Sequence, residues 1–322
     1  MSKKRFGLSV VLAVFVALVP VAGVLADGQV DGEFTIPSAP RDLGVAPDAS
    51  MTPQQQAEID VTVTDYDGMS DIDQIEVVFY YSSDASANGA PLSLSADAQN
   101  VAKMVWDASS GWSLTPAGTT WSLVTGSCST PTLNAATTTG TWTFAFEPGK
   151  VATRTDDPAR WRAFAKVTSV TGSETVEGTS ATTVVMVHYQ EITITAGGSV
   201  DWGNVIPSSD YAANQVTGIG VNYIANGDYT ASVMSDAAWN TAVLGSDPAN
   251  LGDNEFALKA SEDTTLGNAV QVDAAGVALD SAGAQTSEAG VTQSDNTLWL
   301  KLGPTFDVGD YAGHITYMMA NR

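Results

Sequence analysis

Cysteine is nearly absent: the 322 residues contain one, Cys128. A single cysteine excludes an intramolecular disulfide, so burial of a hydrophobic core, with or without bound ions, must stabilise the fold. Cys128 lies in the turn-like run Gly126–Pro131. This setting favours an incidental thiol, and an intermolecular disulfide is the alternative.

Histidine is almost as scarce, with only His188 and His314. Both fall in predicted strands, which favours solvent-facing side chains over a catalytic base. The sequence has no glycine-rich phosphate loop and no paired histidines or cysteines spaced for zinc. A two-carboxylate glycosidase is compatible with the many acidic residues, but no segment suggests a catalytic cleft. We therefore expect no enzymatic activity and no catalytic residues.

Basic residues are few: 13 Lys and Arg stand against 36 Asp and Glu, giving a net charge of −23. Such a chain repels nucleic acid and anionic membranes, so neither is an expected partner. The acidic composition suits cations, high salt or simple solubility. Only 15% of residues are charged, and Thr, Ser, Ala, Gly and Val are abundant. This composition favours short strands and polar turns over disorder.

Long hydrophobic runs are absent except at the N-terminus, where Phe6–Leu25 follows the basic residues Lys3–Arg5. Together with the cleavage-site pattern Val24–Ala26, this run predicts a cleaved signal peptide over residues 1–26 rather than a retained anchor. No lipobox cysteine follows, and the C-terminus carries no apolar anchor. We expect an extracellular or cell-surface protein with no membrane span after cleavage. Loss of three cations leaves 10 basic against 36 acidic residues, a net charge of about −26.

The chain beyond the signal peptide is predicted to be all-β, with two tandem β-sandwich domains joined at a seam over Thr182–Pro207. Residues 27–53 are rich in Pro, Gly, Asp and Ala and predict an extended arm or linker, either loosely docked or adding a strand to a neighbouring subunit. Residues 54–190 form the first predicted domain, and residues 191–322 form the second.

Seven strand candidates in residues 54–190 predict an immunoglobulin-like sandwich. Three inner faces are clear from alternation. They are Ile59, Val61 and Val63; Ile75, Val77 and Phe79; and Trp142, Phe144 and Phe146.

The second predicted domain contains Asn226-Gly227 between two apolar runs, 219–224 and 229–234. Because both turn residues tolerate positive φ, we expect a β-hairpin at this point. Residues 236–243 predict one short helical turn. Further strands are expected at 256–260, 297–302 and 311–319, and a hairpin with long loops is expected within 267–295.

Four carboxylates in one short run form the candidate metal site: Asp65, Asp67, Asp71 and Asp73, placed around Gly68. Carboxylates at alternating positions around a glycine can converge on Ca²⁺, which takes six to eight oxygen ligands. The spacing is not that of an EF-hand. An acidic turn between strands, with Asp and Gly present for backbone reasons, is the alternative and the favoured interpretation. Ca²⁺ is thus the one candidate cofactor.

Eight tryptophans are many for this chain, and five of them fall at predicted strand edges or turns. These five are Trp112, Trp121, Trp202, Trp239 and Trp299. Exposed rings could stack on sugars or fill partner pockets. The favoured interpretation is that they fill the cores and cover the edges of two sandwiches.

Three stretches resemble the immunoglobulin-like modules of prokaryotic surface proteins: Asp71–Phe79, Phe146–Ala152 and Trp161–Val167. The resemblance implies that an acidic turn precedes one strand, and that a later strand containing a tryptophan precedes a closing turn.

The second domain resembles the C-terminal β-sandwich domains of the WxL kind through Ser199–Pro207 and Gly309–Tyr317. That resemblance implies non-covalent attachment to the cell envelope. The Trp-x-Leu signature itself is displaced, because Leu300 and Leu302 flank the position two residues after Trp299.

These observations predict a secreted structural or adhesive protein of the cell surface, in a surface layer, filament or envelope. It would contact itself or other surface proteins through loops and strand edges. The alternative is a carbohydrate- or envelope-binding module protein without catalytic activity, with envelope glycans as partners.

Overall fold

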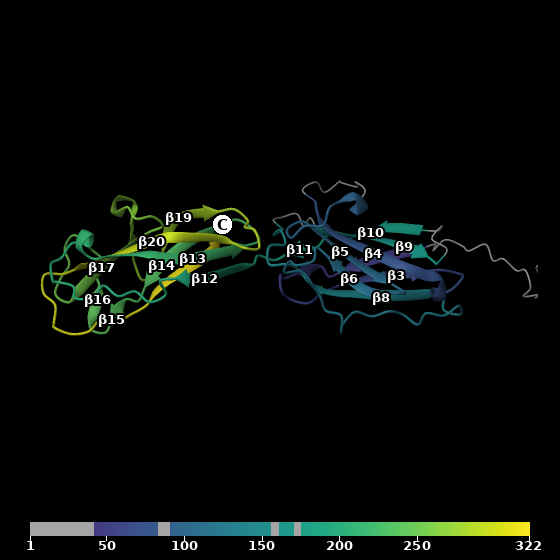
Figure 1. Ribbon diagram of the computed structural model, residues 1–322, viewed down its shortest axis with the longest axis horizontal. Coiled ribbons are helices and arrows are strands. Elements are labelled where there is room, and N and C mark those ends of the chain that lie inside the picture. Colours follow the sequence, from purple (N-terminus) through teal and green to yellow (C-terminus); the bar gives the residue numbers. More distant parts are fainter. Residues whose placement is uncertain (1–41, 83–90, 156–160, 171–174) are drawn as a thin grey trace, which may run out of the picture. The chain divides into compact units, whose positions relative to one another are not determined.

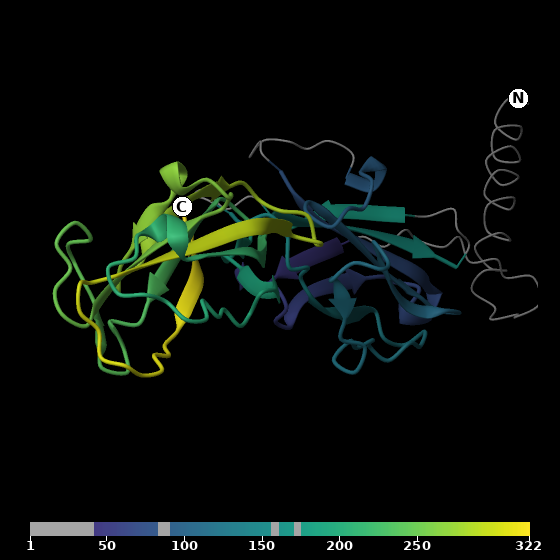
Figure 2. The same cartoon turned by 60° about the vertical axis from the view of Figure 1, so that its left-hand side comes forward.

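The structure is a computed structural model that describes residues 42–82, 91–155, 161–170 and 175–322. These residues form an all-β protein with a few short 3-10 turns, which confirms the predicted all-β class, whereas two tandem immunoglobulin-like sandwiches stay a prediction. The predicted signal peptide, residues 1–26, lies outside the described residues. The strands fall into a first set, β1–β11, and a second set, β12–β21, which share no sheet (Figures 1 and 2).

The first set consists of two larger sheets and one small one. The four-stranded sheet has the order β1 (Asp42–Pro47), β3 (Ala57–Thr64), β8 (Thr139–Glu147) and β7 (Ser122–Leu123). The five-stranded sheet has the order β10 (Thr175–Thr179), β9 (Trp161–Ser169), β4 (Ile72–Tyr81), β5 (Val101–Asp107) and β6 (Gly111–Thr115). A parallel bridge joins β2 (Ser50–Met51) to β11 (Val185–Met186).

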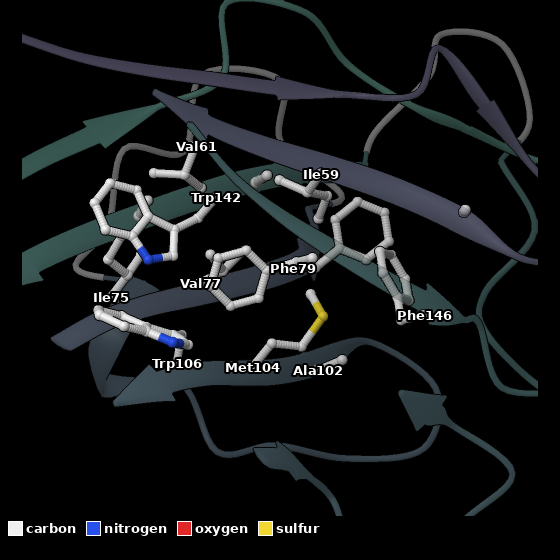
Figure 3. Close-up of a cluster of buried hydrophobic side chains, with 14 of the residues drawn as sticks. Ile59, Val61, Ile75, Val77, Phe79, Ala102, Met104, Trp106, Trp142 and Phe146 are labelled. Carbon is white, nitrogen blue, oxygen red and sulfur yellow. The ribbon is translucent and has the colours of Figure 1, made fainter. Parts of the chain in front are cut away.

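The first core is formed by the faces that alternation predicted, as Figure 3 shows for residues of β3, β4, β5 and β8. All nine predicted inner residues of β3, β4 and β8 are fully buried. Aromatic rings contact one another throughout this core; Phe79, for example, stacks on Trp161 with ring centroids 4.7 Å apart. Such pairs stabilise by more than the area they bury. The period-2 signal therefore located the first core correctly.

The second set consists of a seven-stranded and a three-stranded sheet. The larger sheet has the order β12 (Gln190–Ala196), β13 (Gln215–Ala225), β20 (Val291–Leu302), β17 (Glu255–Ser261), β16 (Ala242–Leu244) and β15 (Ala238–Trp239), with β18 (Val270–Val272) also paired to β17. The smaller sheet has the order β19 (Val277–Gly283), β14 (Tyr229–Ser235) and β21 (Ile315–Asn321). A second core is formed from residues of both sheets.

The prediction of a hairpin at Asn226-Gly227 is wrong. Strand β13 pairs with β12 and β20, whereas β14 pairs with β19 and β21, so the turn connects two different sheets. Neither turn residue has a positive φ. The buried Asn226 side chain instead donates to the carbonyl oxygens of Ala152 (3.0 Å) and Val187 (2.8 Å) and accepts from the Tyr189 N–H (2.7 Å). These long-range bonds, which the local sequence does not encode, fix the turn.

Two further predictions are corrected. Residues 238–244 form the paired strands β15 and β16 rather than a helical turn, because Trp239 is buried against Phe256 with ring centroids 4.9 Å apart. The second correction concerns the predicted arm, residues 27–53. Its described part, residues 42–53, contains strands β1 and β2 of the first strand set. Strand β1 pairs with β3 along its whole length, and its Leu43 and Val45 pack on the first core. Residues 27–41 lie outside the described residues.

Hydrogen bonds join the first strand set to the second, and we call the Asn226, Gln285 and Glu288 contacts the junction. The Glu288 carboxylate accepts from the N–H (2.7 Å) and the hydroxyl (2.6 Å) of Thr120. Gln285 donates to the Val151 carbonyl oxygen (2.6 Å). Both sets belong to one compact unit, so the predicted domain division at residues 190 and 191 stays a prediction.

Candidate functional site

The acidic run begins where β3 ends, at Asp65, whose side chain is fully buried. Its Oδ1 accepts a 2.9 Å hydrogen bond from the Asp67 N–H, which closes an Asx turn. Burial raises the pKa of the Asp65 carboxyl, since a charged group loses its hydration there. Gly68 has φ 99°, and a Cβ at this position would lie 2.5 Å from the Ala135 Cα. The backbone therefore requires glycine whether or not an ion binds.

The four predicted calcium ligands are not gathered into one cluster. In the described part of the chain, no three His, Cys, Asp or Glu side chains lie together as a metal site would require. Asp65 and Asp67 belong to the turn after β3, Asp71 ends the short 3-10 helix η1 (Met69–Asp71), and Asp73 lies within β4. The geometry favours the acidic-turn interpretation, and Ca²⁺ binding by Asp65, Asp67, Asp71 and Asp73 stays a prediction.

Neither histidine lies in a catalytic arrangement among the described contacts. His314 Nδ1 lies 2.9 Å from a carboxylate oxygen of Asp236, at the surface. His188 Nε2 lies 3.2 Å from the Gln190 side-chain oxygen, between β11 and β12 rather than within a strand. Both imidazoles thus contact groups other than a nucleophile.

Cys128 is half-buried, and its Sγ lies 3.4 Å from the Ala145 carbonyl oxygen. Burial raises the pKa of the thiol, which reduces the thiolate fraction and hence its reactivity. This setting supports the incidental-thiol interpretation over an intermolecular disulfide.

Six of the eight tryptophans are buried in the cores. They are Trp106, Trp121, Trp142, Trp161, Trp239 and Trp299, with exposed fractions of 7% or less. Only Trp112 and Trp202 are partly exposed. Most of the rings that could have stacked on sugars therefore pack inside the protein.

Strand β12 ends the seven-stranded sheet, and in the described part of the chain no strand pairs with its outer edge. Its second half is exposed, including Thr193 and Ile194, and Ile194 is 43% exposed. The strand contains neither Lys nor Pro, the residues that commonly protect sheet edges. The sequence did not show which strand would lie at the edge of a sheet.

A cavity of about 810 Å³, here called the second-core cavity, lies over one end of the second core. It is bounded by the irregular segments 197–207 and 306–314 and by buried residues of the sheets. Trp202 lies beside Trp239, with ring centroids 5.7 Å apart. Phe306 meets Tyr311 edge-on at 5.2 Å. No sequence pattern pointed to this cavity, because the two irregular segments of its lining lie about 100 residues apart in the sequence.

No protein-family model matches the chain, and no curated protein matches it significantly. Among the residues described, no helix has both the length and the apolar character needed to cross a membrane.

Proposed function

We propose that the chain is an exported, non-catalytic structural or adhesive protein of the prokaryotic cell surface, associating with itself or with other surface proteins by strand addition at β12. Export is supported by the signal-peptide pattern in residues 1–26. The mode of association is supported by the outer edge of β12, with which none of the described strands pairs.

An edge strand presents a row of unpaired backbone N–H and C=O groups to solvent. An extended segment from another chain satisfies these groups, and alternate side chains then set its register. Exposed Ile194 would add apolar contact to such a pair. The alternation of Ile192 and Ile194 with Thr193 and Thr195 suits a strand partner.

The test is light scattering of residues 27–322 over a range of concentrations, first with Ca²⁺ and then with a chelator. Large assemblies are expected, and Thr193→Lys should reduce them because it places a charge on the edge. Thr62→Lys is the matched control, since β3 pairs with strands on both sides. A wild-type monomer under every condition, or an assembling Thr193→Lys variant, would contradict the proposal. A requirement for Ca²⁺ would support the acidic run as a calcium site.

The carbohydrate-binding alternative has less support, because it needs exposed aromatic rings. Of the eight tryptophans only Trp112 and Trp202 keep part of their surface accessible, and Tyr66 is a further exposed ring. Quenching of tryptophan fluorescence by soluble glycans, lost in Trp112→Ala or Trp202→Ala, would restore that alternative.

A further inference from the structure

The floor of the second-core cavity is apolar. Buried Trp239 and Phe256 belong to the second core and also line the cavity. The outer part contains exposed Val308 together with polar side chains such as Asn204. A cavity of about 810 Å³ has the size of a small-molecule site. An occupant with an apolar body would bury apolar surface against the floor.

The charged groups of the lining are of one sign. Asp201, Asp307 and Asp310 line the cavity, and no Lys or Arg is among the described residues that do so. His314 also lines it, but its imidazole is held 2.9 Å from the Asp236 carboxylate. An anionic ligand would meet uncompensated carboxylates, whereas a cation would be attracted.

Aromatic residues form a third feature of the lining: Trp202, Trp239 and Tyr317 all belong to it. The rings of Trp202 and Trp239 lie with their centroids 5.7 Å apart. The aromatic faces of Trp202, Trp239 and Tyr317 attract cations through their ring quadrupoles.

From these three features we infer that the second-core cavity binds a small organic cation with an apolar body, such as an alkylammonium compound. The carboxylates attract the charge, and the aromatic and aliphatic floor takes the body. This inference goes beyond the proposed function, because strand addition at β12 does not need the cavity. Ile194 of β12 lines the cavity but Thr193 does not, so Thr193→Lys should leave cation binding intact.

The test measures binding of hexyltrimethylammonium to residues 27–322 by calorimetry and tryptophan fluorescence. The neutral isostere, with a carbon in place of the nitrogen, and hexyl sulfate are the comparison probes. We expect the cation to bind about tenfold more tightly than the neutral isostere. Hexyl sulfate should bind more weakly than both.

Two variants separate the contributions of charge and apolar surface. Asp201→Asn with Asp310→Asn should reduce cation binding toward the level of the neutral isostere, because two of the three lining carboxylates lose their charge while the amide oxygens remain. Trp202→Ala should weaken the binding of both the cation and the neutral isostere. Trp202→Phe is the milder substitution to measure if the alanine variant does not fold. Asp295→Asn is the matched control: it removes an exposed carboxylate of β20 outside the cavity.

Equal affinities for cation and neutral isostere would overturn the inference, as would tighter binding of the sulfate. No binding of any probe at millimolar concentration in the folded wild-type protein would overturn it too. Since assembly is measured separately, the cation inference and the strand-addition proposal can fail independently.

Discussion

Side-chain hydrogen bonds of a few polar residues connect the first strand set to the second. Asn226 is fully buried, yet all three of its side-chain hydrogen bonds reach residues more than 35 positions away in the sequence. A buried side-chain amide costs little stability when its hydrogen-bonding groups are all paired, whereas an unpaired one lowers the free energy of unfolding. The junction is therefore specific in geometry.

Asn226→Ala removes the amide and leaves backbone groups of residues 152, 187 and 189, of which the first is buried and the others partly buried, without this partner. We expect the free energy of unfolding to fall by about 3 kcal/mol. Urea denaturation followed by circular dichroism measures this. Asn222→Ala is the control, since Asn222 makes its hydrogen bond to Thr292 at the surface and should change stability by less than about 0.5 kcal/mol. Equal effects of the two variants would contradict the role of Asn226.

Acid should weaken the contact between Glu191 and Lys150, which lie 2.6 Å apart. The hydrogen bond from Lys150 holds the Glu191 pKa below its usual value of 4.5. A lowered folded pKa means stability that is present above the unfolded pKa and lost as pH falls through the folded pKa. In thermal melts from pH 7 to pH 3, Glu191→Gln should therefore lose less stability on acidification than wild type. Parallel pH profiles would contradict this linkage.

At the scale of elements, β1 is part of the first fold and not an arm. It forms six register pairs with β3 and packs Leu43 and Val45 against the core. Its position also covers what would otherwise be the edge of β3. A strand supplied by the same chain leaves no acceptor edge at β3 for a neighbour.

Deleting residues 42–47 should lower the free energy of unfolding by about 2–3 kcal/mol, from loss of two half-buried apolar side chains. It should also increase aggregation, because the edge of β3 becomes exposed. Urea titration and light scattering measure the two effects. An unchanged urea midpoint would mean that β1 is only loosely docked.

At the scale of the whole molecule, two separate cores share one chain. Each core has its own buried aromatic residues, while the described contacts of the junction are mainly hydrogen bonds. Polar junctions of this kind couple neighbouring units less strongly than a shared hydrophobic core does.

Phe256→Ala should therefore destabilise the second core by about 4 kcal/mol and leave the first core largely intact. Calorimetry should show one transition moving to lower temperature and a second one little changed. Hydrogen exchange of amides in β3 and β17 assigns the transitions. A single transition that moves as a whole would refute the predicted domain division at residues 190 and 191.

The sequence by itself determined the all-β class and most of the first core. Alternation in β3, β4 and β8 reports directly which side chains avoid water, because neighbouring residues of a strand face opposite sides of the sheet. The same logic located β13, β14 and β17, and the positions of all these strands agree with the structure to within a few residues.

Only the tertiary structure decided which strands pair. The local sequence at Asn226-Gly227 favours a tight hairpin, yet Asn226 finds buried backbone partners in the first strand set and the chain crosses between sheets instead. The β12 edge, the place of β1 and the second-core cavity likewise depend on contacts between residues far apart in sequence. Alternation of apolar and polar residues within one segment reports which of its side chains are buried. Strand pairing and cavities depend instead on contacts between distant residues, which no single segment encodes.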